Sequence, residues 1–299
     1  MLKIPCTSNI DHMSAINQPA ARCKDGDTVI FQTMDCFDGA VTDKGICDRE
    51  GKKEGKYMAN PATGPLYIEG AMPGDALSVE ILDIQTRGWG VMGTGFGQNA
   101  FINYKGESEM RVFNYEDGFV KIGSKQIPTD IMIGVIGVAP AGDPIPTVTP
   151  DSHGGNMDCN RIVTGSKILF PVAVEGGLLA MGDLHALMGD GEVFEYGLET
   201  AGEVTARVKV VKNAVKELAI KQPTLYQGGR VMTVASAKTY EDAVRLALEA
   251  MYEYLLARGW EKVDAGMLMS MKCDLAICQI VDPQITVRAM MDENLICYY

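Results

Sequence analysis

Acidic residues and one histidine are concentrated in the stretch from Met181 to Glu199. The ionisable side chains of this stretch are Asp183, His185, Asp190, Glu192, Glu195 and Glu199. The whole chain of 299 residues has only 3 histidines, and a second polar run, from Asp151 to Asp158, holds another of them. Carboxylates and imidazoles bind divalent cations and transfer protons in hydrolytic sites. The two runs together are therefore the candidate metal or hydrolytic centre.

Asp183 and His185 are two residues apart, so on a strand both side chains face the same way. This spacing predicts a pair of metal ligands on an extended element. Glu192 follows a Gly-Asp-Gly turn, in which the backbone can approach an ion without a Cβ in the way. Imidazole and carboxylate donors suit Zn²⁺, Mn²⁺ or Fe²⁺, whereas an oxygen-rich site suits Ca²⁺ or Mg²⁺. We expect a divalent metal ion, with Zn²⁺ as the first candidate and Ca²⁺ or another divalent ion as the alternative.

The upstream run supplies an imidazole, an amide and a carboxylate through His153, Asn156 and Asp158. Its two glycines, Gly154 and Gly155, allow a sharp bend or backbone N–H groups that point at an oxyanion. Each of these residues also has a purely structural interpretation, because acids near glycine commonly occupy exposed turns and most single histidines are structural. The combination of the two runs favours a functional site.

The composition limits the classes of partner. Lys and Arg total 27 against 39 Asp and Glu, which is a formal net charge of −12. Nucleic acids and anionic membranes bind clustered basic residues, so neither is expected as a partner, whereas small neutral substrates are compatible. No run of about 18 uncharged apolar residues and no secretory signal is present, so we expect a cytosolic protein. The 8 cysteines include no Cys-x-x-Cys pair, and reduced thiols are expected.

Short segments of alternating apolar and polar residues predict most of the fold. The clearest begins at Ala76 and places Leu77, Val79 and Ile81 on one face. Further strands are expected at residues 28–35, 66–69, 119–122, 131–138, 167–174 and 204–211. Glycine and proline rather than helices connect these segments, which favours antiparallel sheets over a doubly wound sheet. We therefore expect a mainly β protein of the α+β class.

Helices are expected only towards the C-terminus. Thr239 and Asp242 form a capping pair at the start of the first, and Gly259 ends it. A second helix is expected over residues 262–271. A strand pair is expected over residues 274–281 and 285–290.

The Lys- and Gly-rich segment within residues 38–65 has no core pattern and is expected to be a surface loop. The glycine-rich segment of residues 88–97 carries Trp89 and Phe96 and is expected to be either a flexible loop that shapes a pocket or a structural crossover. The second segment matches G-x-G-x-x-G, but glycines continue where a dinucleotide site needs a helix. No nucleotide site is therefore expected.

Three segments resemble the acetamidase/formamidase family: Gly64 to Asp75, the His-Gly-Gly-Asn-Met-Asp box at residues 153–158, and Gly182 to Glu192. The resemblance implies hydrolysis of short-chain amides to a carboxylate and ammonia, in a cytosolic homo-oligomer that is a dimer or a multiple of dimers. It also implies a fold dominated by a β-sandwich, with a smaller α/β part towards the C-terminus. We expect one domain over residues 1–299, whose sandwich part (1–150) and α/β part (151–299) do not separate.

The site hypothesis combines this resemblance with the chemistry of the residues. The expected metal ligands are His153, Asp158, Asp183, His185 and Glu192, and the resemblance adds Asp35. The expected catalytic residues are Glu192 as general acid and base, Asn156 as an orienting group, and His153. Glu195 and Glu199 are left out of the core site, because only proximity in the sequence supports them.

Alternatives stay open at this point. The same site could act on another small amide or on a urea-like compound, or a non-enzymatic β-sandwich module could hold a structural ion. A thiolate at Cys159 could attack an amide, although the sequence pairs no base with it. Ser152 lacks the context of a nucleophile elbow.

Overall fold

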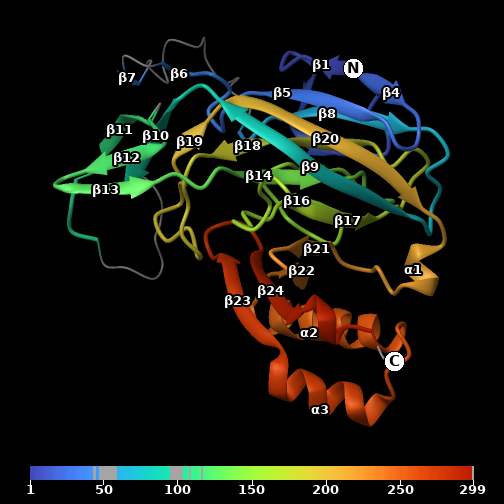
Figure 1. Cartoon of the computed structure of the whole chain (residues 1–299). Helices are drawn as coiled ribbons and strands as arrows, with labels where there is room; N and C mark the ends of the chain where they lie inside the picture. The colour runs from blue at the N-terminus through green and yellow to red at the C-terminus, as the bar shows by residue number, and fades with distance from the viewer. Residues whose placement is uncertain (43–44, 47–58, 95–103, 108, 116, 298–299) are drawn as a thin grey trace.

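The computed structural model describes residues 1–42, 45–46, 59–94, 104–107, 109–115 and 117–297. Two large β-sheets pack against each other, and helices cover the part of one sheet that the C-terminal strands form (Figure 1). The fold is mainly β, with a small helical part near the C-terminus. This confirms the fold class expected from the sequence.

The first sheet has 9 strands in the order β1-β5-β20-β9-β17-β21-β22-β24-β23. Their bounds are β1 (Leu2–Ile4), β5 (Thr28–Thr33), β20 (Gly202–Val211), β9 (Ala76–Thr86), β17 (Lys167–Pro171), β21 (Thr224–Gln227), β22 (Arg230–Ala237), β24 (Ile285–Asp292) and β23 (Asp274–Gln279). All neighbours are antiparallel except β1 and β5. One sheet thus continues from the N-terminal strands to the C-terminal hairpin.

The second sheet also has 9 strands, with a main order of β11-β10-β19-β18-β14-β16, while β8 pairs with β18 and both β2 and β4 pair with β8. The bounds are β11 (Glu109–Asn114), β10 (Trp89–Thr94), β19 (Glu199–Thr200), β18 (Leu179–His185), β14 (Met132–Gly137), β16 (Gly154–Asn156), β8 (Ala62–Ile68), β2 (Asn9–Ile10) and β4 (Ala21–Cys23). Smaller pairs are β12 (Phe119–Ile122) with β13 (Lys125–Pro128), β3 (His12–Met13) with β15 (Ile145–Pro146), and β6 (Val41–Thr42) with β7 (Gly45–Ile46).

The main hydrophobic core lies between the two sheets. Leu77, Val79 and Ile81, the face predicted from the alternation, are 0% exposed. They belong to one buried cluster with Ile133 of β14 and Leu184 of β18, which are strands of the opposite sheet. Burial of apolar side chains from both sheets stabilises the sandwich and holds the second sheet, which carries most of the candidate site, against the first.

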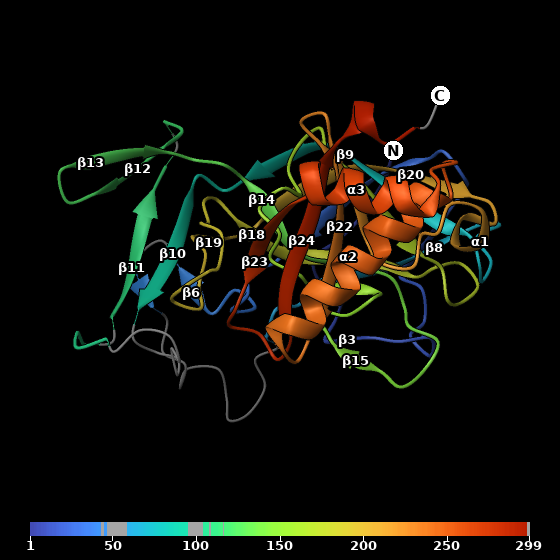
Figure 2. The same ribbon diagram turned by 90° about the horizontal axis from the view of Figure 1, so that it is seen from below.

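The helices form a separate layer on the C-terminal half of the first sheet (Figure 2). They are α1 (Ala214–Glu217), α2 (Tyr240–Leu256) and α3 (Lys262–Lys272), followed by the 3₁₀ turn η1 (Glu293–Leu295). Thr239 caps α2 by accepting a hydrogen bond of 3.1 Å from the Asp242 backbone N–H, as the sequence predicted. None of the described helices is long and apolar enough to cross a membrane.

The glycine-rich segment of residues 88–97 is not the loop expected from the sequence over its first part. Trp89–Thr94 forms β10, which pairs with β11 along its length and with β19 at Val91. A Cβ on Gly90 would lie 2.7 Å from the carbonyl oxygen of Glu199, so this glycine permits a close strand contact rather than flexibility. Phe96 lies outside the described residues, as does most of the Lys- and Gly-rich segment, residues 47–58.

Candidate functional site

The predicted ligand pair lies on a strand, as expected. Asp183 and His185 are at the C-terminal end of β18, and Nε2 of His185 is 3.5 Å from Oδ1 of Asp183. In the antiparallel pair of β18 and β19, His185 lies opposite Glu199, whose Oε2 is 3.2 Å from the same nitrogen. Cross-strand neighbours are close enough for direct contact, so the sheet register brings Glu199 to the site.

Asp158 and Glu192 complete the group around the imidazole. Oδ1 of Asp158 is 3.9 Å from Nε2 of His185. Asp158, His185 and Glu192 each offer a ligand atom, and these atoms all lie within 4.8 Å of one another. The three residues are 0%, 1% and 6% exposed. Asp183 and Glu199 form a second such group with Cys36, in which the ligand atoms also lie within 4.8 Å of one another. These residues form a site that could hold a metal ion.

The turn that carries Glu192 is bound to the C-terminal part of the chain. The N–H of Gly191 donates to the carbonyl oxygen of Cys278 at 2.8 Å, and Ile280 donates back to Gly191 at 3.2 Å. Gly191 also forms a bridge with Gln279, at the end of β23. The end of β23 therefore positions the backbone that presents Glu192 to the sandwich.

The turn between β23 and β24 adds a carboxylate that the sequence did not single out. Asp282 accepts a hydrogen bond of 2.9 Å from Nδ2 of Asn156. The turn is held by Gln279, whose Oε1 accepts from the N–H groups of Val281 at 2.8 Å and Asp282 at 3.0 Å. No local pattern in the sequence showed that Asp282 meets Asn156.

Two glycines leave room for the site. A Cβ on Gly134 of β14 would lie 2.5 Å from Oδ1 of Asp158 and 2.8 Å from the carbonyl oxygen of Asp183. A Cβ on Gly197 would lie 2.4 Å from Nδ1 of His185. Real Cβ atoms do not approach this closely, so the acids and the imidazole occupy space that only glycine leaves free.

Three of the candidate residues have a left-handed backbone. The φ angles are +42° at Asp158, +55° at Asp183 and +48° at Glu192. This conformation is unfavourable for residues that have a Cβ, and such positions are concentrated at active and ligand-binding sites. The backbone is thus strained at these three residues, whose carboxylates converge.

The buried carboxyl groups favour their protonated forms when no cation is bound. Burial raises the pKa of Asp158 to about 6, although the charge of His185 opposes the shift. Burial likewise raises the pKa of Glu199 to about 8. The pKa values of Glu192 and Asp282 are raised well above the ordinary range, through burial and then through the charge of Asp158. The buried carboxylates of the cluster therefore need protons or another positive charge to balance their negative charge.

The pKa of His185 is raised although the residue is buried. Burial alone would lower its pKa, but the charges of Glu199 and Asp183 raise the pKa well above the ordinary value. One imidazole cannot balance several carboxylates, and buried charges are costly unless they are paired. Across the described residues, both oxygens of Asp158, Oδ1 of Asp183 and Oε2 of Glu199 have no hydrogen-bond partner. Unpartnered carboxylate oxygens beside an imidazole fit a divalent cation.

The cluster borders a small cavity of about 120 Å³. We call it the polar cavity, because its wall includes Asn156, Asp183, Glu192, Glu199 and Asp282. Asp183 is fixed there by Nδ2 of Asn60, which donates to its Oδ2 at 2.9 Å. Tyr196 also lines the polar cavity.

Two predicted ligands lie outside the two groups of ligand atoms that the described residues form. Asp35 is fully buried, and its Oδ2 accepts a hydrogen bond of 2.9 Å from the guanidinium of Arg87, while its Oδ1 accepts from the N–H groups of Phe37 and Gly39. His153 is 4% exposed, and burial lowers its pKa to about 4, so its imidazole is neutral. Both ring nitrogens of His153 lack a hydrogen-bond partner within the described part of the chain.

Glu195 and Glu199, which the sequence analysis left out of the core site, lie in different environments. Glu199, which the sequence argument left out, contacts His185, whereas Glu195 is only half-buried on the wall of the polar cavity. The Gly154 N–H, a candidate oxyanion donor, donates instead to the carbonyl oxygen of Asp151 at 2.9 Å.

Cys159 belongs to the core between the sheets and is 0% exposed. The neighbouring thiol of Cys278 lowers the pKa of Cys159 to about 7, against burial, which raises it. The guanidinium of Arg288 also lowers it and lies 3.5 Å from Sγ of Cys278. The groups that stabilise its thiolate are thus a thiol and a guanidinium rather than the base that a thiol nucleophile needs.

The model of the acetamidase/formamidase family matches residues 14–144 and 141–294 of this chain. The chain therefore belongs to the acetamidase/formamidase family. Its structure is similar to that of an acetamidase from Bacillus halodurans, with a TM-score of 0.88 and 39% identity over 98% of both chains. It is also similar to a predicted acetamidase/formamidase from Thermoanaerobacter tengcongensis, with a TM-score of 0.90 and 38% identity over 98% of this chain and 96% of that one.

A formamidase from Methylophilus methylotrophus is 28% identical over 263 residues. That match covers 68% of this chain and 64% of the relative. The chain thus spans slightly less than two thirds of the length of this relative, whereas it matches the two solved structures almost end to end.

Proposed function

We propose that this chain hydrolyses primary carboxamides to a carboxylate and ammonia at the polar cavity, with the help of a divalent metal ion. The observation that carries the proposal is the buried convergence of Asp158, His185 and Glu192, whose ligand atoms lie within 4.8 Å of one another. Membership of the acetamidase/formamidase family supports the choice of an amide as substrate. The expected products follow from cleavage of the carbon–nitrogen bond by water.

The residues that would hold the ion are Asp158, Asp183, His185 and Glu199, because their donor atoms surround Nε2 of His185 and include the unpartnered oxygens. A bound divalent ion would lower the pKa of a water molecule and polarise the amide carbonyl. Imidazole and carboxylate donors keep Zn²⁺ as the first candidate and Ca²⁺ or another divalent ion as the alternative. Glu192, also expected as a ligand, joins the group of Asp158 and His185 but is assigned to proton transfer. Asp35 and His153 are outside the ligand set, since Arg87 engages the first and the second joins neither group.

Glu192 is the residue that moves the proton. Its carboxyl group lines the polar cavity, and its ligand atom lies within 4.8 Å of those of Asp158 and His185. A carboxylate in this position can act as a general base towards a water molecule in the cavity. Glu192 would take a proton from the attacking water and return it to the amide nitrogen, which is otherwise a poor leaving group.

Asn156 would orient the substrate. Its Nδ2 is held by Asp282, and its Oδ1 has no hydrogen-bond partner in the described part of the chain. A carbonyl oxygen fixed in this way can accept a hydrogen bond from the N–H₂ group of a primary amide. The homo-oligomeric state and the cytosolic location stay predictions of the family resemblance.

The test is ammonia release from formamide, acetamide and urea, measured for the wild type, Glu192→Gln and Glu241→Gln. Loss of the general base is expected to lower kcat for the two amides by about 10² to 10⁴-fold. Glu241 is an exposed acid in the first turn of α2, so its substitution should leave the rate within about twofold of wild type. Absence of ammonia from every substrate, or full activity of Glu192→Gln, would falsify the proposal. Turnover of urea alone would favour the urea-like alternative.

A further inference from the structure

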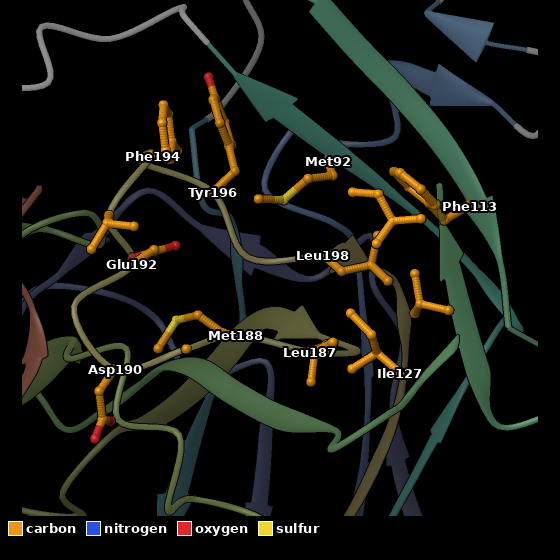
Figure 3. A pocket seen from close by; sticks show the side chains of 14 residues that line it. Met92, Phe113, Ile127, Leu187, Met188, Asp190, Glu192, Phe194, Tyr196 and Leu198 are labelled. Carbon is orange, nitrogen blue, oxygen red and sulfur yellow. The ribbon is translucent and has the colours of Figure 1, made fainter. Parts of the chain in front are cut away.

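An apolar cavity of about 250 Å³ adjoins the polar one and has about twice its volume. We call it the apolar cavity, because its wall is mainly aliphatic and aromatic, with Met92, Phe113, Val120, Ile127, Leu187 and Leu198 among its residues (Figure 3). These side chains come from the β10–β11 and β12–β13 hairpins and from the segment that follows β18. The two hairpins lie at one end of the molecule (Figure 1).

The two cavities meet at two residues. Glu192 and Tyr196 line both of them, and Figure 3 shows both side chains on the same side of the apolar cavity. The proposed proton-transfer residue is therefore at the boundary between the acid cluster and the apolar wall. An amide group held beside Glu192 would therefore have its acyl group next to the apolar wall.

The chemistry of the apolar cavity indicates what its occupant is. The carboxylate of Asp190, which lies at its edge, is engaged by Arg288 through hydrogen bonds of 2.9 and 2.6 Å. An uncharged apolar group gains from leaving water in such a pocket, whereas a polar group would lose hydrogen bonds. Formamide has no carbon substituent on its carbonyl, and the single methyl group of acetamide would fill only a small part of the 250 Å³.

We infer that this chain acts preferentially on primary amides with a bulky apolar acyl group, aromatic or branched, which the apolar cavity holds while the amide group lies at the acid cluster. The inference rests on the proposed amide hydrolysis. In the reaction, the oxygen of water bonds to the carbonyl carbon and the carbon–nitrogen bond breaks with its electron pair on nitrogen. Nitrogen leaves as ammonia after receiving the proton that Glu192 took from the water. Benzamide and water would thus yield benzoic acid and ammonia, which exchange a proton to give benzoate and ammonium.

Ile127 is the position that tests the cavity. It lies on β13, is 36% exposed and faces the cavity in Figure 3, so substitution there does not disturb the main core. Ile127→Trp fills the cavity and Ile127→Ala removes apolar contact from its wall. Ile16→Trp is the matched control, because Ile16 is 79% exposed and does not line the cavity.

The experiment compares kcat/KM for benzamide and acetamide across these variants, with a thermal melt for each. We expect the wild type to favour benzamide by at least about tenfold, since apolar groups that fit a pocket contribute differences of this size. Ile127→Trp should lower kcat/KM for benzamide by about tenfold or more and leave acetamide within about twofold. Ile127→Ala should lower the benzamide value by a smaller factor, and Ile16→Trp should change neither.

Other results would overturn the inference. If acetamide is hydrolysed and benzamide is not, or if Ile127→Trp and Ile127→Ala both leave the benzamide-to-acetamide ratio unchanged, the substrate class is wrong while the proposed function stands. If Ile127→Trp changes the oligomeric state in sedimentation and leaves both rates unchanged, the cavity is a contact between copies. If neither amide is hydrolysed by the wild type, the proposed function fails and the inference fails with it.

Discussion

The polar and apolar cavities share Glu192 and Tyr196 but are built from different parts of the chain by different means. The polar cavity draws on β16, β18, β19, the turn before Glu192 and the turn after β23, and its acids include residues with left-handed backbone. The apolar cavity is lined mainly by two hairpins and one connecting segment. The first depends on the central packing of the fold, and the second on elements at its edge.

This difference assigns a separate role to each region. Convergent carboxylates around His185 require long-range register and glycine contacts, so changes there should alter the chemical step for every substrate. Apart from the shared Glu192 and Tyr196, the wall of the apolar cavity contacts only the acyl group in the inferred mode of binding. Changes there should alter the ranking of substrates and leave the chemistry intact.

Among the changes that test this division between the cavities, the largest effect is expected from Gly134→Ala. The new Cβ would lie 2.5 Å from Oδ1 of Asp158, so the carboxylate or the strand must move. Displacement of a reacting group by about 1 Å can cost about 100-fold in rate, and kcat should fall by about this factor for every amide. Gly142→Ala is the control, because a Cβ there has no atom within 4 Å. Steady-state kinetics that show an unchanged kcat, or a change for one amide only, would break the division between the two cavities.

A smaller effect separates Glu199 from Glu195. Oε2 of Glu199 is 3.2 Å from Nε2 of His185, so Glu199→Gln should weaken binding of Zn²⁺ by about 10- to 100-fold. Glu195 is half-buried and no more than part of the cavity wall, and Glu195→Gln should leave the affinity within about twofold. Calorimetric titration of metal-stripped protein measures both affinities. Equal affinities for the two variants would remove Glu199 from the proposed ligand set.

The smallest effect concerns the stability of metal-stripped protein. The folded pKa of Glu199 is about 8, above the unfolded value of about 4.3, so the folded state holds a proton that the unfolded state releases as the pH rises. The raised pKa of His185 acts in the same direction, because its stabilisation is complete below its unfolded pKa of about 6.5 and is lost as the pH passes its folded pKa. Tm should therefore fall by at least about 3 °C between about pH 5.5 and about pH 8.

Added divalent ion should reduce this fall, since the ion takes the place of the released protons. Differential scanning calorimetry with and without the ion makes the comparison. A Tm of stripped protein that rises over the same interval would show that the acid cluster does not bind protons in the way the structure indicates.

Local patterns in the sequence predicted those strand faces and helix ends that nearby residues specify. The alternation of Leu77, Val79 and Ile81 and the cap at Thr239 each appear as expected, because strand faces and helix ends are specified by residues close in sequence. The expectation of a loop is wrong for Trp89–Thr94, which forms β10. Gly90 lies close to the backbone of Glu199 in β19, and that contact depends on a partner more than 100 residues away.

The same difference between local patterns and long-range contacts applies to the candidate site. Asp158, Asp183, His185 and Glu192 were found in two polar runs, and the structure brings all four to one cluster. Glu199 reaches His185 only through the pairing of two strands, so its distance along the sequence carried no signal.

Asp282 was missed for a related reason. It meets Asn156 only because the turn after β23 folds onto the sandwich, where Gln279 holds it. Asp35 is an acid after a strand like several others in the chain, and only the structure shows that Arg87 engages it.

The most direct test of the account is ammonia release from acetamide by chelated protein as Zn²⁺ is returned in steps, with Asp158→Asn and His185→Gln beside the wild type. Chelation is expected to abolish the activity, and the wild type is expected to recover it to a plateau as the ion binds, whereas the two variants are not. Full activity of the chelated wild type would contradict a metal-dependent reaction at this cluster.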